Sequence, residues 1–228
     1  MIKAIVTGHS RGLGAAIAGN LLARGIAVLG IARHGNAALA AGFPGRLAEA
    51  ALDLTDNARL AAWLDGGTLA AFVAGSEQVL LVNNAGLLAP VGQLAAQPPE
   101  AIARAIGCNV AAALMLAAAS ARISAAAKVA GLRILHISSG AGRYAIPGWS
   151  VYGAGKAALD HHARVIDTGM QAEIRGTPLA DFPLRGKFET LKESGALATP
   201  EDCAAGIVAH LLGERFGETP VADLRELA

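Results

Sequence analysis

Tyr152 and Lys156 are the residues whose types and spacing point most directly to chemistry. They lie four positions apart in the stretch "SVYGAGK", so they share one face if the stretch is helical. An ammonium beside a phenol favours the phenolate and lowers the pKa of the phenol from ~10. A tyrosine of this kind can donate a proton to a carbonyl near neutral pH. A surface pair at the same spacing is common by chance, so the interpretation needs support from the rest of the chain.

A glycine-rich turn, "TGHSRGLG" from Thr7 to Gly14, gives that support. It follows the apolar run Ile2–Val6 and leads into the helical stretch Gly12–Arg24. A strand, a glycine-rich turn and a helix N-terminus form an anion site, because backbone N–H groups point outward and glycine lets a phosphate approach closely. Ordinary tight turns show the same glycines, but a place on the first of several alternating strands favours a dinucleotide site.

The end of the second apolar run indicates which dinucleotide is bound. That run ends "GIARH", with Ala32 where an acid would hydrogen-bond the ribose hydroxyls and Arg33 directly after it. Arg33 and Arg11 can clamp a doubly charged 2′-phosphate. The alternative is that both arginines are solvated surface residues. The pattern predicts NADP as the cofactor.

Apolar runs of strand length alternate with helical stretches along the chain. Strands are predicted at Ile2–Val6, Ala27–Ala32, Ala48–Leu52, Val79–Val82 and Leu132–Ile137, with a short last strand at Pro220–Leu224. Helices are predicted at Gly12–Arg24, Asn57–Leu64, Glu100–Lys128 and Val151–Arg164, and from a Thr199 cap to about Leu212. This order indicates an α/β fold: a single Rossmann-like, doubly wound parallel sheet with helices on both faces, forming one domain over residues 1–228.

Composition limits the class of protein. Hydrophobic residues make up 54% of the 228 residues, charged residues 16%, and the net charge is +1. A large core is therefore expected, with no nucleic-acid partner. The most apolar helical stretch, Val110–Ala119, is shorter than the ~20 residues that span a bilayer, so we expect no membrane association.

The cysteines and histidines show no metal-site or disulfide pattern. Cys108 and Cys203 are far apart, which favours buried free thiols and a reducing cytoplasm. His9 and the pair His161-His162 lack the spacing of a ligand set, so we expect polar surface or supporting roles and no metal.

Taken together, these stretches resemble the short-chain dehydrogenase/reductase family, in family order and over nearly the whole chain. The matching positions are Thr7, Gly8, Gly12 and Gly14, the run Asn83-Asn84-Ala85-Gly86, Asn109, Ser139, Tyr152 and Lys156. The later stretches Asp167–Arg175 and Leu191–Ala204 are similar to the branch that contains sepiapterin reductase and the bacterial benzil reductases.

The resemblance implies roles for individual residues. Tyr152 is the general acid, and Lys156 lowers its pKa and holds the nicotinamide ribose. Ser139, whose spacing fits the family better than that of Ser138, hydrogen-bonds the substrate carbonyl. Asn109 holds a water that links Lys156 to solvent. The implied cofactor contacts are Gly8, Ser10, Arg11, Gly12, Leu13, Gly14, Arg33, Asp53, Asn83, Ala85, Gly86, Tyr152, Lys156 and Thr168.

One part of the family pattern is missing. The family has a sixth strand after the Tyr/Lys helix, but "HHARVIDTGM" passes directly from helix to loop. A helix from Tyr152 to Arg164 runs roughly 18 Å away from the ligand-binding edge of the sheet. Thr168, an implied cofactor contact, must lie at that edge again, but the four steps from Arg164 to Thr168 span at most about 14 Å. We therefore predict that ~15–20 residues are missing between about Ala163 and Ile166. Either this segment is disordered and the residues on its two sides are numbered consecutively, or the protein has a true deletion.

These observations predict NADPH-dependent reduction of a small ketone or diketone to an alcohol. The substrate pocket would include Trp149 and a lid at about 169–194 that carries Met170 and Phe182. The missing strand keeps a second possibility open, an NADP-binding sensor or structural relative without turnover, and dehydratase or epimerase chemistry is a more distant third. The helices from Ala111 and from Val151 resemble the pair through which the family dimerises, so a homodimer or homotetramer is expected.

Overall fold

A five-stranded parallel sheet forms the centre of the computed structural model, which describes residues 1–159, 199–218 and 223–224. The strands lie in the order β3-β2-β1-β4-β5. Their bounds are β1 Ile2–Thr7, β2 Ala27–Ala32, β3 Leu47–Ala51, β4 Gln78–Asn83 and β5 Gly131–His136. Each differs from its predicted run by one residue or less at either end, because short apolar runs between turn residues mark buried parallel strands well.

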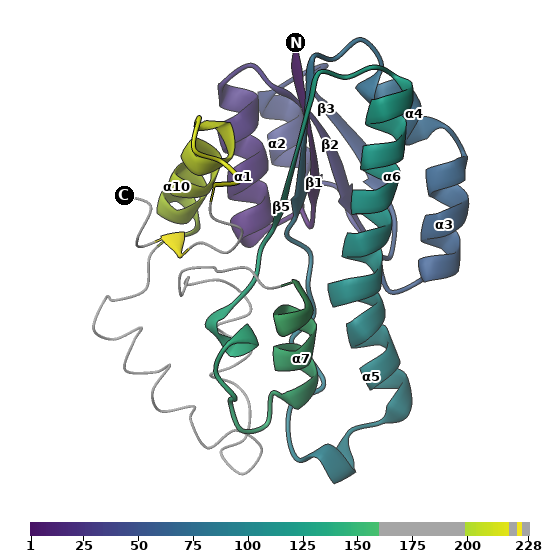
Figure 1. Ribbon diagram of the computed structural model, residues 1–228, viewed down its shortest axis with the longest axis vertical. Coiled ribbons are helices and arrows are strands. Elements are labelled where there is room, and N and C mark those ends of the chain that lie inside the picture. The colour runs from purple at the N-terminus through teal and green to yellow at the C-terminus, as the bar shows by residue number, and fades with distance from the viewer. Residues whose placement is uncertain (160–198, 219–222, 225–228) are drawn as a thin grey trace.

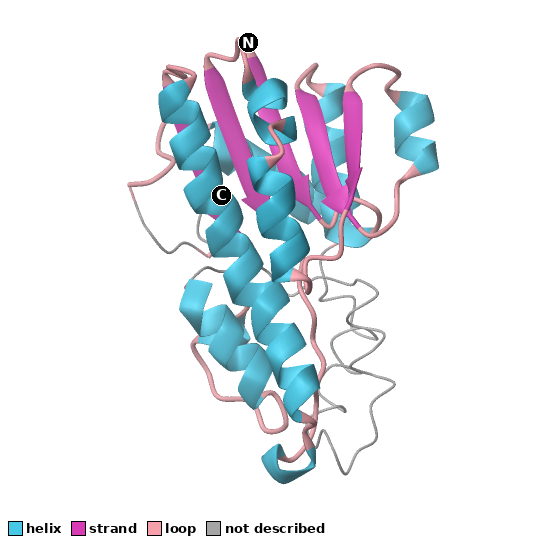
Figure 2. Ribbon diagram, turned by 90° about the vertical axis from the view of Figure 1, so that its right-hand side faces the viewer, coloured by secondary structure: helices cyan, strands magenta, loops and turns pink. Residues whose placement is uncertain are grey.

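Helices cover both faces of the sheet (Figures 1 and 2). α1, α2 and α10 lie on one face and α3, α4 and α6 on the other, while α5 continues α6 beyond the ends of the strands. The bounds are α1 Gly12–Ala23, α2 Ala37–Gly42, α3 Asn57–Asp65, α4 Thr68–Val73, α5 Pro99–Ile106, α6 Ala112–Ala126, α7 Ser150–Leu159 and α10 Pro200–Leu212. This confirms the predicted doubly wound α/β fold; the short helices α2 and α4 were not predicted.

Successive side chains of each central strand enter two separate cores. In β1, Ala4 and Val6 pack against α1 and α10, whereas Ile5 packs against α3, α4 and α6. Adjacent residues of a strand point to opposite faces, so a strand buried on both sides needs apolar residues throughout. In β4, Leu80 and Leu81 are divided between the two cores in the same way. A slip of one residue would exchange the two faces, so this pattern fixes the register of the strands and thereby the positions of the loops at their ends.

The predicted helix Glu100–Lys128 is interrupted in its middle. α5 and α6 are joined by a π-helical turn, η2, over Gly107–Ala111. The run Pro99–Ala126 is 28 residues long and contains an 18-residue window with mean hydropathy 1.7, so by length and composition it could cross a membrane. The length argument made from Val110–Ala119 alone was therefore wrong, although α6 contributes residues such as Leu116 to the core against the sheet.

Several expectations fall on residues outside the described part of the chain. These are the missing segment near 163–166, Thr168, the lid at 169–194 with Met170 and Phe182, and the helix beyond Leu159. Of the last predicted strand, only Asp223 and Leu224 are described, and neither is in a strand. β5, an edge of the described sheet, is half-buried along its whole length, whereas five of the six residues of β4 are buried.

Candidate active site

The loops at the carboxyl ends of β1 and β4 are joined through Thr7. Its Oγ1 accepts hydrogen bonds from the main-chain N–H groups of Asn84 and Ala85, both at 2.9 Å, and Asn84 Nδ2 donates to the Thr7 carbonyl at 2.9 Å. Gly8 N donates to Ile31 O on β2 at 2.8 Å. Three adjacent strand ends are thus held together at the edge where ligands bind in such sheets.

The glycine-rich turn has the form of an anion cradle. A Cβ at Gly14 would lie 2.2 Å from the Gly8 carbonyl oxygen, so α1 approaches the turn as only glycine allows, whereas a Cβ at Gly12 would meet nothing within 4 Å. The N-cap Arg11 makes no side-chain capping bond, and the first turn of α1 contains no acid. The N–H groups at this helix end therefore lack a side-chain partner, which fits the pyrophosphate of a dinucleotide.

The residues predicted at the adenosine end lie in the turn after β1 and directly after β2 and β3. Arg11 and Arg33 are exposed. Asp53 accepts hydrogen bonds from the N–H and Oγ1 of Thr55, at 3.0 and 2.8 Å. The pKa of Asp53 is lowered mainly by the Thr55 backbone bond and also by the charge of Arg33. Arg33 is thus close enough to Asp53 for its charge to act on the carboxylate, and their shared role in cofactor binding stays a prediction.

Asn109 holds the loop after β4 by its side chain. Its Oδ1 accepts from Leu87 N at 2.7 Å, and its Nδ2 donates to Leu87 O at 2.8 Å. These two bonds fix the side chain against the loop after β4, and the predicted water-holding role stays a prediction. Asn109 lies in the π-helical turn η2, a type of turn frequent at functional sites.

Asn83 and Gly86 lie at the two ends of the same loop. Asn83 Nδ2 donates to Ala113 O at 3.1 Å and contacts His136 Nδ1 at 3.2 Å, which ties β4 to α6 and β5. A Cβ at Gly86 would lie 3.6 Å from Lys156 Nζ. The loop therefore runs from the sheet core to the ammonium of the catalytic pair.

Ser138 and Ser139 have different surroundings. Ser138 Oγ is buried and donates to the Lys156 carbonyl at 3.1 Å. Ser139 accepts from Ala141 N at 3.2 Å, and its side chain hydrogen-bonds Tyr152. Ser139 therefore faces the phenol, as the family spacing implies, and Ser138 supports the helix backbone.

Two glycines that the sequence analysis did not single out allow this contact. The short 3-10 turn η3, Gly140–Gly142, lies against α7. A Cβ at Gly142 would lie 2.9 Å from the Lys156 carbonyl carbon, and one at Gly153 would lie 2.9 Å from Ala141 O. No periodicity reveals a close approach of this kind, because it depends on two segments that are distant along the chain.

Tyr152 and Lys156 share the buried face of α7, but the predicted direction of one pKa shift was wrong. The side chains are 5% and 4% exposed, and Lys156 Nζ lies 5.7 Å from the Tyr152 ring centroid. Burial raises the pKa of Tyr152 to about 12, against a lowering by the Ser139 hydrogen bond. Burial lowers the pKa of Lys156 to about 8. Desolvation exceeds the effect of the ammonium, which donates instead to Ile137 O at 2.7 Å.

An apolar cluster surrounds the phenol. Trp149 meets the Tyr152 ring edge to face, with centroids 5.3 Å apart and planes at 83°. Leu88 and Ala141 are buried in the same cluster, with Val91 and Ile146 at its margin. Trp149 therefore packs against Tyr152, as the packing alternative expected, and its place in the substrate pocket stays a prediction.

Three other sequence interpretations can be compared with the structure. Cys108 and Cys203 are buried free thiols, as expected. Leu13, predicted to contact the cofactor, places its side chain in the core, which leaves only its main chain for a ligand. His9 is fully buried, so a surface role is wrong and only a supporting role is possible. In the described part of the chain, no three His, Cys, Asp or Glu side chains form a metal-binding group.

The fold and these residues define a dinucleotide-dependent oxidoreductase. A family model for "short chain dehydrogenase" matches residues 3–175, and the chain belongs to this family. Members bind a nicotinamide cofactor, and carbonyl reduction is the general activity that the relatives support.

The relatives fall in the branch expected from the sequence. The chain is 30% identical to a benzil reductase, (S)-benzoin forming, from Bacillus cereus, over 97% of this chain and 98% of that protein. It is 32% identical to sepiapterin reductase from Meriones unguiculatus, over 87% and 86%. A solved short-chain dehydrogenase/reductase from Burkholderia vietnamiensis is 43% identical over 100% and 98%, with a TM-score of 0.68.

The length of one alignment bears on the missing segment. The match to the Bacillus cereus protein runs over 251 positions, more than the 228 residues of this chain. That relative therefore has residues without a counterpart here. This agrees with the predicted absence of a segment but does not locate it, so the position near 163–166 stays a prediction.

Proposed function

We propose that the protein uses NADPH to reduce a small ketone or diketone to the alcohol. The observation that carries the proposal is the hydrogen bond between Ser139 and Tyr152 beside Lys156, at the sheet edge that also bears the glycine-rich turn. When bound, the reduced nicotinamide supplies a hydride to the carbonyl carbon. The cofactor would lie against Gly8, Ser10, Gly12, Gly14, Asp53, Asn83, Ala85 and Gly86, with Thr168 as a further contact.

The residues of this chain supply the proton and hold the carbonyl. Ser139 hydrogen-bonds the carbonyl oxygen, and Tyr152 donates its phenolic proton to that oxygen as the C–H bond forms. Because burial holds the pKa of Tyr152 at about 12, the phenol keeps its proton at neutral pH until the substrate oxygen acquires charge. Lys156 places a positive charge beside the tyrosine that has lost its proton.

The surroundings of Tyr152 favour carbonyls with apolar substituents. Leu88, Val91, Ile146 and Trp149 offer hydrocarbon and ring surface next to the phenol, which suits an apolar substituent on the carbonyl. This agrees with the benzil reductase relatives, whose named substrate is an aromatic diketone.

NADP specificity is proposed from the charges at the adenosine end. Ala32 occupies the position at the end of β2 where an acid would favour NAD, and Arg33 follows it directly. Arg11 is the N-cap residue of α1, and its side chain makes no capping hydrogen bond. Two guanidiniums at this edge match the double charge of a 2′-phosphate. We further propose a cytoplasmic enzyme that forms a homodimer or homotetramer.

A panel of carbonyl compounds tests the activity. Ketones, α-diketones including benzil, and an aldehyde are incubated with protein and NADPH, and the absorbance of the reduced nicotinamide is followed. We expect NADPH consumption with at least one diketone, and its loss in the matched Tyr152→Phe variant. Tight NADPH binding without oxidation by any carbonyl would favour the alternative, an NADP-binding sensor without turnover.

A further inference from the structure

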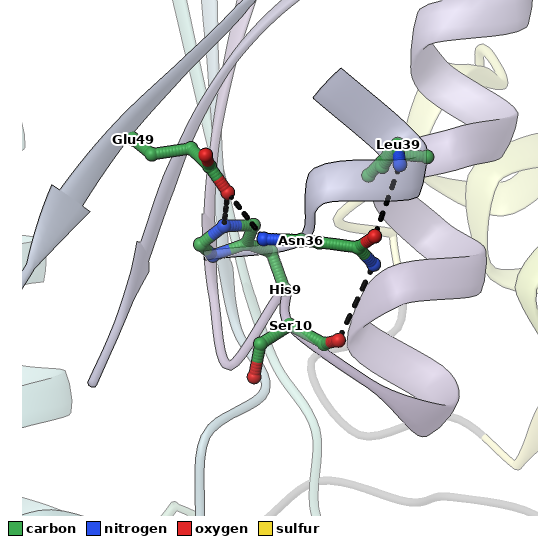
Figure 3. Close-up of polar contacts among 5 residues, drawn as sticks. All are labelled: His9, Ser10, Asn36, Leu39 and Glu49. Atoms are coloured by element: carbon green, nitrogen blue, oxygen red, sulfur yellow. Dashed lines mark hydrogen bonds and ion pairs between the residues drawn. The ribbon is translucent and has the colours of Figure 1, made fainter. Parts of the chain in front are cut away.

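His9 in the glycine-rich turn and Glu49 on β3 form a partly buried pair (Figure 3). His9 Nε2 lies 2.7 Å from Glu49 Oε1, and the side chains are 1% and 29% exposed. The same carboxylate oxygen accepts a hydrogen bond from Asn36 N, also at 2.7 Å. One acidic residue on β3 thus holds both the turn after β1 and the loop after β2.

Asn36 closes the network (Figure 3). Its Oδ1 accepts from Leu39 N at 3.0 Å and caps α2, while its Nδ2 donates to Ser10 O at 3.2 Å. A continuous circuit therefore runs from Glu49 through His9 and Ser10 in the turn to Asn36 and back to Glu49. Each loop is bound to the other directly and also through the carboxylate.

Two glycines, one on β2 and one in the loop after it, leave room for this pair. Gly30 on β2 is in register with Glu49 on β3. A Cβ at Gly30 would lie 2.4 Å from His9 Cγ, and a Cβ at Gly35 would lie 3.0 Å from Glu49 Oε2. Any other residue at Gly30 would collide with the imidazole ring. The site of the ring is therefore specified by three segments of the chain.

The loops joined by this circuit are the ones that carry the arginines of the proposed 2′-phosphate site. Arg11 lies two residues after His9, and Arg33 lies three residues before Asn36. The side chains of Arg11 and Arg33 form no hydrogen bond or ion pair with the described residues of the circuit, so its effect on them acts through the main chain. Glu49 is kept ionised, because the His9 hydrogen bond and then the Asn36 N–H lower its pKa, and a charged acceptor gives the stronger hydrogen bonds.

We propose that His9 and Glu49 are positioning residues that hold the turn 8–12 and the loop 33–36 at the separation that binds the adenosine 2′-phosphate. The inference rests on the proposed NADPH dependence and deepens it. The pair sets cofactor selectivity without contacting the cofactor. Breaking the pair leaves the Asn36–Ser10 hydrogen bond as the remaining direct tie between the two arginine-bearing loops. Their separation is then less well fixed, and NADPH loses more affinity than NADH, which has no 2′-phosphate.

The test compares four single variants with the unmodified protein. Glu49→Ala removes the acceptor on an edge strand, His9→Ala removes the donor, and His9→Gln restores an N–H donor of similar reach. Glu218→Ala is the control, because it breaks an exposed pair of comparable length, Arg215 Nε to Glu218 Oε2 at 2.9 Å, in a segment after α10. Dissociation constants for NADPH and NADH, the thermal midpoint, and KM and kcat are measured for each.

We expect Glu49→Ala and His9→Ala to raise the NADPH dissociation constant by roughly tenfold, equivalent to about 1.4 kcal/mol. The NADH constant should change much less, and KM for NADPH should rise more than kcat falls. His9→Gln should recover most of the NADPH affinity, and Glu218→Ala should leave both constants unchanged. This pattern would support the inference, because a merely structural pair would lower the thermal midpoint without changing the preference between the cofactors.

Two results would overturn the inference, and they are distinguishable. If the unmodified protein prefers NADPH and the variants keep the same NADPH-to-NADH ratio, the positioning role is wrong and the proposed function stands. If the unmodified protein binds both cofactors equally, the 2′-phosphate site itself is wrong and the inference falls with it. Glu49→Ala keeps the experiment decisive if His9→Ala does not fold.

Discussion

At the adenosine end of the site, Glu49 accepts hydrogen bonds from His9 and from the Asn36 N–H, and these partners lower its pKa. At the catalytic end, Tyr152 and Lys156 are almost completely buried, and desolvation is the largest cause of both shifts, to about 12 and about 8. At the adenosine end, the hydrogen-bond partners of Glu49 outweigh its desolvation. At the catalytic end, desolvation outweighs the other effects on Tyr152 and Lys156. Compensation holds a binding surface in place, whereas desolvated groups respond to charge that develops during a reaction.

Removing the proton donor should produce the largest effect. Tyr152→Phe deletes only the hydroxyl, so the cofactor end stays intact while turnover falls by roughly 10²–10⁴-fold. The measurement pairs single-turnover kinetics with an NADPH titration. An active Tyr152→Phe variant would assign the acid to another residue, and a loss of NADPH affinity equal to the loss of rate would show that the two ends are not separate.

The two serines after β5 should differ in the kind of defect they cause. Ser139→Ala removes the hydroxyl that faces the phenol, and kcat should fall by roughly 10²–10³-fold, the usual effect of losing one donor to a developing oxyanion. Ser138→Ala removes a bond to the Lys156 carbonyl and should lower the thermal midpoint more than kcat. The reverse order would show that Ser138 is the substrate contact.

Reversing the charge at Arg33 tests the binding end. Arg33→Asp should raise the NADPH dissociation constant by roughly 10–100-fold, because a charge-assisted contact contributes about 1.5–3 kcal/mol. NADH binding should improve, since the new acid can accept from the ribose hydroxyls. Titrations with both cofactors measure the change. Equal affinities in the unmodified protein would contradict the proposed NADP preference.

The smallest effect we expect is a pH dependence of stability that differs between the two ends. The pKa of Lys156 falls from 10.5 to about 8 on folding, so the unfolded chain binds more protons between these values, and Lys156 makes stability rise with pH from about 8. The buried Cys108 thiol, whose pKa is raised from 9.0 to about 11, opposes this rise above pH 9. Tyr152 acts in the opposite direction only above pH 10. The folded pKa of Glu49 lies below 4.5, so its contribution is present above that pH and is lost as the pH falls.

Urea unfolding of the protein and two variants separates these contributions. Lys156→Met should abolish the alkaline rise and leave the acid limb unchanged, while Glu49→Gln should weaken the acid limb alone. An alkaline rise that persists in Lys156→Met would assign it to another group. An acid limb unchanged in Glu49→Gln would show that the pair with His9 contributes little to folding.

Much of the site was predictable because its residues lie next to strand ends and helix starts. Strands β1 to β5 and α10 with its Thr199 cap follow from apolar runs and turn residues. Ser139 was preferred to Ser138 by spacing, and the structure places it on the phenol. The direction of the Tyr152 pKa shift was wrong, because the Tyr/Lys spacing shows that two groups are neighbours but not how much water reaches them.

The sequence by itself determined the order of elements, the glycine-rich turn, the Tyr152/Lys156 spacing and the family, because each is carried by short stretches of neighbouring residues. The tertiary structure alone decided that His9 meets Glu49, 40 positions away, that Gly142 and Gly153 let η3 lie against α7, and that the middle of the long helix forms a π turn around Asn109. These features depend on which distant segments pack together. Packing removes water and fixes distances, and it thereby sets both the pKa values at one end of the site and the charge compensation at the other.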